Sequence, residues 1–225
     1  MSARPEATTS GAVYKRPLPF VRRSSDRRIE VFSPKLGRRL SLTSYAAWQL
    51  WIALEANPAV SMFCERPAAI EGVPRRTIDF WVRFNRQGVD EFWLLDDSDD
   101  PADEAEAPEA DVGSVPQSFP EHVRGTALRL IPRRNLLAWS TPIANWAQLI
   151  PHLVTWRRFA DPLLAQSIVV YLGQLRTLDD ILARFNEHDG AMTEAALYSL
   201  VANGRVVSPD LATLPLNGST RFRRA

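Results

Sequence analysis

The sequence predicts a mixed α/β protein with a helical C-terminal domain, and three observations support this prediction. Apolar residues at helical spacing follow Ser44, strand-like segments lie between residues 60 and 95, and short helical segments with a β segment end the chain. With 225 residues, 45% hydrophobic and 24% charged, the chain is long enough to bury one or two cores. These fractions argue against a wholly disordered chain.

The single cysteine, Cys64, excludes a disulfide framework and a cysteine-rich zinc site, and it favours a reducing compartment. No apolar run approaches the roughly 20 residues that span a bilayer. The first thirty residues also lack the apolar core of a signal peptide. We therefore expect a soluble, cytoplasmic protein without a membrane partner.

Charge is distributed unevenly along the chain, although its formal sum is only +1. Residues 90–121 hold 12 acidic and no basic side chains, so the remaining residues carry a net charge of +13. Arginine supplies 25 of the 27 basic residues, and its planar fork binds phosphate oxygens in pairs. A basic body is typical of a nucleic-acid binder. The simpler alternative is a GC-rich genome, whose codons favour arginine on any protein surface.

The N-terminal part of the chain predicts an arm, a strand and a helix. Residues 1–29 are polar, basic and interrupted by prolines, which is typical of a flexible arm. A short strand is expected at 28–32. The segment 44–55 contains no Gly or Pro, Ser44 can cap its N-terminus, and Pro58 follows its end. This pattern predicts a helix.

Strand pieces are expected at 60–63 and 68–71, followed by a hairpin of strands 76–86 and 92–95 around the Gln87-Gly88 turn. The segment 97–121 is acidic, contains four prolines and has almost no large apolar residues, which predicts a disordered insertion. It is either a solvated loop or a flap that mimics DNA over a basic cleft.

The remaining elements predict a second domain. A strand and four helices are expected, followed by a short strand or wing, at 126–131, 145–153, 162–175, 177–185, 193–204 and 205–211. Pro151 is expected to break the first of these helices. The last two helices, a Gly stop and the β segment predict a winged-helix-like module. The expected domains are therefore 30–155, with the insertion, and 156–225.

Two carboxylates are candidates for chemistry. Asp79 lies inside a strand-like apolar segment, where a carboxylate needs a hydrogen bond, an arginine or a metal ion. Asp96 ends the partner strand, so the two can converge in a hairpin and hold Mg²⁺ beside a phosphate. The alternatives are an arginine partner for Asp79, such as Arg75 or Arg76, and a mere loop position for Asp96.

The run from Ser33 to Leu95 resembles the N-terminal domain of TnsA, the endonuclease subunit of heteromeric transposases. The segments that carry the resemblance are Ser33-Pro34-Lys35-Leu36-Gly37-Arg38, Leu54-Glu55-Ala56-Asn57-Pro58-Ala59-Val60, Phe63-Cys64-Glu65-Arg66-Pro67, Arg75-Arg76-Thr77-Ile78-Asp79-Phe80, Leu94-Leu95-Asp96-Asp97-Ser98 and Asn145-Trp146-Ala147-Gln148-Leu149. Their order and spacing are moderately specific, although no single motif is.

The resemblance implies a restriction-endonuclease-like core that cleaves the 5′ strands at transposon ends with Mg²⁺. It implies double-stranded DNA, a DDE transposase subunit and an AAA+ ATPase regulator as partners. Asp79 and Asp96 would be catalytic residues and metal ligands. The expected DNA-binding residues are Arg38, Arg39, Arg66, Arg75 and Arg76.

The sequence also departs from the family pattern. The catalytic Glu of the first helix is replaced by Ala47, and the Glu-x-Lys of the last strand becomes Asp96-Asp97-Ser98. A methyl group cannot bind a cation, and a hydroxyl cannot supply the positive charge of a lysine. We therefore expect nuclease activity to be impaired or lost, with Mg²⁺ bound weakly or not at all.

Two alternatives remain open. In the first, the chain is a non-enzymatic DNA-binding regulator or scaffold. In the second, it is an active endonuclease whose missing carboxylate comes from elsewhere, with Glu65 and Glu71 as candidates. The helix 193–204 carries no Arg or Lys, which argues for a protein contact rather than base reading by the C-terminal domain.

Overall fold

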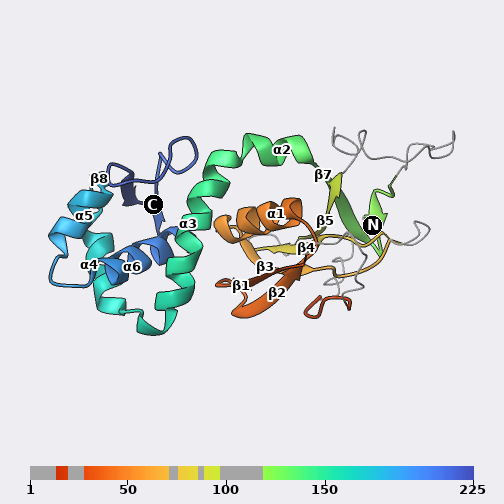
Figure 1. The fold of residues 1–225 in the computed structure, drawn as a ribbon, viewed down its shortest axis with the longest axis horizontal. Helices are drawn as coiled ribbons and strands as arrows, with labels where there is room; N and C mark the ends of the chain where they lie inside the picture. Colours follow the sequence, from red (N-terminus) through yellow and green to blue (C-terminus); the bar gives the residue numbers. More distant parts are fainter. Residues whose placement is uncertain (1–13, 20–27, 71–75, 86–88, 97–118) are drawn as a thin grey trace, which may run out of the picture. The chain divides into compact units, whose positions relative to one another are not determined.

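The computed structural model describes residues 14–19, 28–70, 76–85, 89–96 and 119–225. The protein is mixed α/β and divides into two compact units (Figure 1). Unit 1 comprises residues 1–21 and 59–131, and unit 2 comprises residues 22–58 and 132–225. This division differs from the expected domains 30–155 and 156–225, because residues 28–58 belong with the C-terminal helices.

Unit 1 is built on a five-stranded sheet with the order β3-β4-β5-β7-β6. Its strands are β3 (Val60–Glu65), β4 (Phe80–Phe84), β5 (Asp90–Asp96), β6 (His122–Val123) and β7 (Thr126–Pro132). β4 pairs antiparallel with β3 and with β5, which confirms the predicted hairpin. The expected strand piece at 68–71 is reduced to one bridge between Ala69 and Thr77.

One face of this sheet carries an apolar core. Cys64, Trp81 and Phe92 are opposite each other in the register and are fully buried. Tyr14 packs on this face, with its ring centroid 5.3 Å from that of Phe92 and 5.8 Å from that of Trp81. The backbone N–H of Leu18 donates to the carbonyl of Arg66 at 2.8 Å. Residues 14–19 of the expected arm are thus attached to the sheet, while most of the arm lies outside the described residues.

The first part of unit 2 is a hairpin followed by a helix. β1 (Ile29–Ser33) pairs antiparallel with β2 (Arg38–Leu42), a strand that the sequence analysis missed. The helix α1 (Tyr45–Ala56) begins as predicted, since the Ser44 hydroxyl accepts a hydrogen bond from the Ala47 N–H at 3.0 Å. α1 packs against β1, β2 and two later helices, α2 (Arg133–Ala138) and α3 (Ser140–Trp156).

The expectation that Pro151 breaks a helix at 145–153 is wrong. α3 starts at Ser140 and continues through Pro151 to Trp156. The proline ring removes one backbone hydrogen bond from the helix. Ile150 and Leu153 on either side are buried, so their packing outweighs the loss of that bond.

The C-terminal part of unit 2 alternates helices with very short strands. They are the 3₁₀ helix η1 (Arg157–Phe159), α4 (Pro162–Tyr171), β8 (Arg176–Thr177), α5 (Leu178–Arg184), α6 (Gly190–Ala202), β9 (Val206–Val207) and β10 (Arg221–Arg224). β10 lies between β8 and β9 and is antiparallel to both. α6 packs against α3, α4 and α5. None of the helices in the described ranges is long and apolar enough to cross a membrane.

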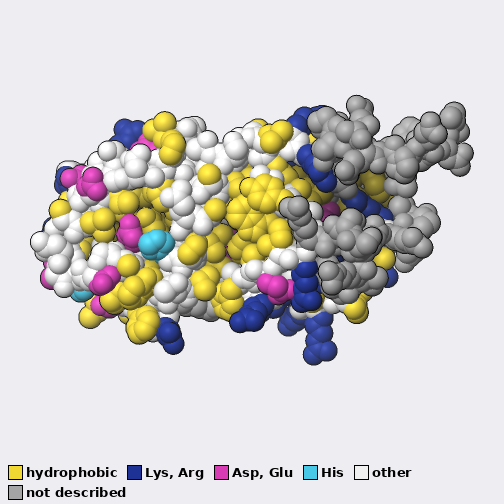
Figure 2. Space-filling model, in the orientation of Figure 1, with side chains coloured by type: hydrophobic (Ala, Val, Ile, Leu, Met, Phe, Trp, Pro, Cys, Tyr) yellow, Lys and Arg dark blue, Asp and Glu magenta, His cyan; other side chains and the backbone are white. Residues whose placement is uncertain are grey.

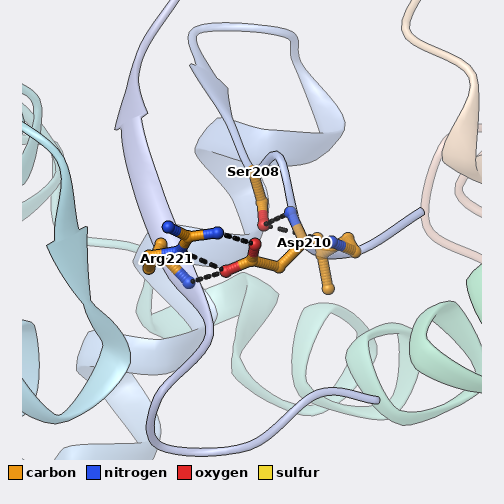
Figure 3. A network of polar contacts seen from close by, with 4 residues as sticks. Ser208, Asp210 and Arg221 are labelled. Atoms are coloured by element: carbon orange, nitrogen blue, oxygen red, sulfur yellow. Dashed lines mark hydrogen bonds and ion pairs between the residues drawn. The ribbon is translucent and has the colours of Figure 1, made fainter. Parts of the chain in front are cut away.

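Two buried polar side chains hold the loop between β9 and β10. Asp210 accepts hydrogen bonds from the backbone N–H, Nε and Nη2 of Arg221 at 2.6–2.9 Å, and Ser208 accepts the backbone N–H of Asp210 (Figure 3). The hydrogen bonds from Arg221 keep the pKa of Asp210 below its usual range. Asn145 of α3 donates to the carbonyls of Leu211 and Leu214.

Candidate functional site

The predicted carboxylate site of unit 1 lies at one end of the sheet. β3 ends at Glu65, β4 begins at Phe80 and β5 ends at Asp96. Because β4 is antiparallel to both neighbours, these three positions lie at the same end. The structure therefore brings Asp79, Asp96, Arg66 and Arg76 to one end of the sheet.

Asp79 and Arg76 complete the backbone pairing of the longer strand β5. One carboxylate oxygen of Asp79 accepts the N–H of Leu95 at 2.8 Å, and Nη2 of Arg76 donates to the Leu95 carbonyl at 2.5 Å. β5 extends beyond the point where β4 begins at Phe80. The two side chains therefore bind the backbone N–H and carbonyl of Leu95 in place of a strand partner. The contact also places the Asp79 carboxylate beside the residue that precedes Asp96.

Arg66 approaches the same end from β3. Its backbone N–H donates to the Asp79 carbonyl at 2.9 Å, and its φ of 45° turns the chain out of the strand. Glu65, one of the two candidate replacement carboxylates, is almost fully buried and opposite Phe80. The other candidate, Glu71, lies outside the described residues. The same is true of Arg75, a predicted DNA-binding residue, and of Ser98, which follows the second carboxylate.

Arg38 and Arg39 lie in the β1–β2 hairpin of unit 2. Arg39 is exposed and opposite Phe32 on the outer face, whereas Arg38 is opposite the buried Ser33. Nη1 of Arg38 donates to the Arg39 carbonyl at 3.1 Å. Arg39 is therefore the better placed of the two for contact with a phosphate in solution.

The described side chains of unit 1 do not form the donor set of a complete catalytic metal centre. Among the described residues, no three His, Cys, Asp or Glu side chains are grouped to hold an ion. Asp79 directs one oxygen to the Leu95 N–H. Ala47, where the resemblance led us to expect a catalytic Glu, belongs to unit 2 and is a buried residue of α1. Mg²⁺ needs hard oxygen ligands in octahedral geometry. We therefore derive no reaction step through a metal ion.

A second polar cluster, in unit 2, was not predicted. Glu55 of α1 is 3% exposed, and it accepts hydrogen bonds from the Ser33 hydroxyl, from Nε1 of Trp51 at 3.1 Å and from the Lys35 N–H at 3.2 Å. Nζ of Lys35 donates to the carbonyls of Leu54 and Asn57, both at 2.7 Å, and so caps the C-terminus of α1.

This cluster borders a pocket of about 290 Å³ in unit 2. Lys35 and Glu55 form part of its lining, and the helices α3, α4 and α6 with η1 supply most of the rest. The signals that could have indicated the cluster were Ser33-Pro34-Lys35 and Leu54-Glu55, which were noted only as sequence segments. These two segments come together because the β1–β2 hairpin packs against α1. Strand β2 of that hairpin was not predicted.

Burial changes the proton affinity of both charged groups in this cluster. Desolvation lowers the pKa of Lys35 from 10.5 to about 8, and desolvation raises the pKa of Glu55 despite its hydrogen bonds. For Lys35 the unfolded chain therefore binds more protons than the folded chain between about pH 8 and pH 10.5. Its contribution to the unfolding free energy must rise with pH across this window.

We expect the difference in unfolding free energy between the wild type and Lys35→Met to grow from pH 8 to pH 10. Urea unfolding followed by circular dichroism at several pH values measures it. The variant lacks the titrating ammonium, so the slope due to Lys35 disappears even if its stability is lower throughout. A constant difference over this range would contradict the pKa assigned to Lys35.

Aromatic side chains are also exposed on α1. Tyr45 is 63% exposed and stacks on Trp48, with ring centroids 5.0 Å apart. Hydrophobic side chains gather over α1 on the face that Figure 2 shows. Isolated apolar residues are common on surfaces, so this pair by itself assigns no function.

Comparison with known proteins gives no family. No family model matches the chain, and no curated protein matches it.

Proposed function

We propose that this chain is a TnsA-like subunit of a transposition complex, which binds transposon-end DNA and partner proteins and has impaired or lost endonuclease activity. The observation that carries the proposal is the end of the sheet where Asp79, Asp96, Arg66 and Arg76 meet. In a restriction-endonuclease-like core, carboxylates at this place hold Mg²⁺ and the arginines contact phosphates. The small number of donors among the described residues is compatible with a protein that binds DNA without cleaving it.

The element order of the C-terminal part supports a winged-helix-like module in this proposal. α4, β8, α5, α6, β9 and β10 follow one another as helix, strand, two helices and two strands, with β10 between β8 and β9. α6 would be the recognition helix. It packs against α3, α4 and α5, and most of its side chains are buried or half-buried. We therefore assign this module to contacts with the partner transposase or ATPase.

The first test combines metal and DNA binding by Asp79→Asn. We expect the wild type to bind Mn²⁺ weakly or not at all, because the described donors are too few. DNA binding by the variant should be unchanged or stronger, since the substitution removes a negative charge and its amide oxygen can still accept the Leu95 N–H. Fluorescence anisotropy with labelled duplex DNA and electron paramagnetic resonance of Mn²⁺ measure the two properties.

Glu121→Gln is the matched control, because it removes an exposed carboxylate from the same unit. A large loss of DNA binding in Asp79→Asn alone would overturn the proposed role of this residue. Tight Mn²⁺ binding that disappears in Asp79→Asn would instead favour the active endonuclease with a relocated carboxylate, for which Glu65 is the described candidate.

The second candidate function is a DNA-binding regulator or scaffold that uses the C-terminal module. Alanine substitution of Arg205, Arg223 and Arg224, all exposed, separates the two functions. If the module contacts protein, the triple variant should weaken duplex binding less than about threefold at fixed salt. If these arginines contact phosphates instead, their removal should weaken duplex binding strongly, because such binding depends steeply on charge. Arg221 is left intact because it binds Asp210. A loss of more than tenfold would favour the regulator.

A further inference from the structure

The pocket of unit 2 has two unlike apolar walls. Trp156 of α3 and Phe159 of η1 bring aromatic rings, with centroids 5.7 Å apart. α6 brings the small side chains of Ala195, Ala196 and Ser199. Aromatic rings on one side and small residues on the other leave room for a flat apolar group.

Two charged groups in the pocket lining, Lys35 and Glu55, have unused hydrogen-bonding capacity. An ammonium group has three hydrogens, and Nζ of Lys35 gives two of them to main-chain carbonyls among the described residues. Oε1 of Glu55 accepts two hydrogen bonds, but Oε2 accepts only the Lys35 N–H within the same part of the chain. Glu55 is almost fully buried and is one of the residues that line the pocket.

The charges around the pocket favour a neutral ligand. Lys35, Glu55 and Asp161 are its charged lining residues. A ligand carboxylate would approach two carboxylates, and a ligand ammonium would approach that of Lys35. Desolvating a second charge beside a like charge is costly. An amide offers a carbonyl to Lys35 and an N–H to Glu55 without any charge.

We propose that this pocket binds a small, neutral aromatic amide, with its ring between Trp156 and α6 and its amide paired with Lys35 and Glu55. The site lies in unit 2 and is independent of the carboxylate site of unit 1 and of the proposed DNA binding. The same chemistry is present in a free aromatic carboxamide and in a peptide group beside an aromatic side chain.

The test titrates the full-length chain with benzamide, benzoate and benzylamine, followed by saturation-transfer NMR. We expect saturable binding of benzamide and at least about tenfold weaker binding of the two charged probes, as expected for the loss of one or two hydrogen bonds. N-acetylphenylalaninamide is a fourth probe. Tighter binding of this probe than of benzamide would identify a peptide group as the ligand. Weaker binding would identify a free aromatic carboxamide.

Ala196→Leu fills the pocket and leaves the polar pair intact, so it should weaken benzamide binding at least about tenfold. Ala144→Leu, at an exposed position of α3 outside the pocket, is the control and should leave binding unchanged. Lys35→Met should weaken benzamide binding and remove its preference over benzylamine, because the repelling ammonium is gone, after circular dichroism has shown that the variant is folded. The proposal is overturned if benzamide does not saturate, if the three probes bind equally, or if folded Ala196→Leu binds like the wild type.

Discussion

Asn145→Ala should lower the unfolding free energy by about 2 kcal/mol or more, because it removes three hydrogen bonds to the backbone, one of them to the buried Leu211 carbonyl. Asn145 is 1% exposed. Its Nδ2 donates to the Leu211 and Leu214 carbonyls at 2.9 and 2.8 Å, and its Oδ1 accepts the Leu216 N–H at 2.8 Å. Each unsatisfied buried group costs about 1–3 kcal/mol. Thermal unfolding followed by circular dichroism measures the loss as a lower Tm.

Gln148→Ala is the control for this substitution. Gln148 lies on the same helix, is exposed, and its amide makes only a 3.4 Å contact with the Ala144 carbonyl. Its truncation should change the unfolding free energy by less than about 0.5 kcal/mol, as is usual for surface positions. Equal effects of the two substitutions would show that the loop 211–216 does not depend on Asn145.

Glu55→Ala should also be strongly destabilising, by about 3 kcal/mol or more at pH 7, because it leaves buried donors without their acceptor and each such group costs about 1–3 kcal/mol. The substitution leaves the Lys35 ammonium buried without its carboxylate and removes the acceptor of the Ser33 hydroxyl and the Trp51 indole. Urea unfolding at pH 7 gives the change in free energy.

Glu30→Ala is the control on the same hairpin. Glu30 is exposed and contacts Arg28 and the Ser41 hydroxyl, and exposed ion pairs contribute about 0–1 kcal/mol. Raising the pH to 9.5 should reduce the cost of Glu55→Ala, since Lys35 is then largely neutral in the folded protein. A cost for Glu55→Ala that matches that of Glu30→Ala would mean that the buried cluster contributes no more than a surface pair.

The sequence predicted those elements whose ends are determined by neighbouring residues. α1 starts after the Ser44 cap and ends before Pro58, as expected, and the Thr177 cap opens α5 as expected. The strands β8 and β10 were missed because they are very short and pair across a long separation, Arg176 with Phe222. Hydrophobic periodicity carries no information on such pairs.

The two sites also differ in whether neighbouring residues or distant segments determine their contacts. The approach of Asp79 to the end of β5 followed from an antiparallel hairpin, which the turn at 87–88 indicates directly. The approach of Lys35 to Glu55 required a strand that was not predicted and a helix packed beside it. A local pattern cannot give a contact between two such segments, because tertiary packing decides it.

The chain order of the two units has a consequence for synthesis. Residues 59–131 interrupt unit 2, so α1 emerges from the ribosome well before α3, its packing partner. Until that helix is made, α1, whose buried residues include Leu50, Trp51 and Leu54, lacks one of the elements that pack against it. We expect a fragment ending at residue 131 to aggregate, and completion of this unit to wait until translation has passed β10, which ends at Arg224.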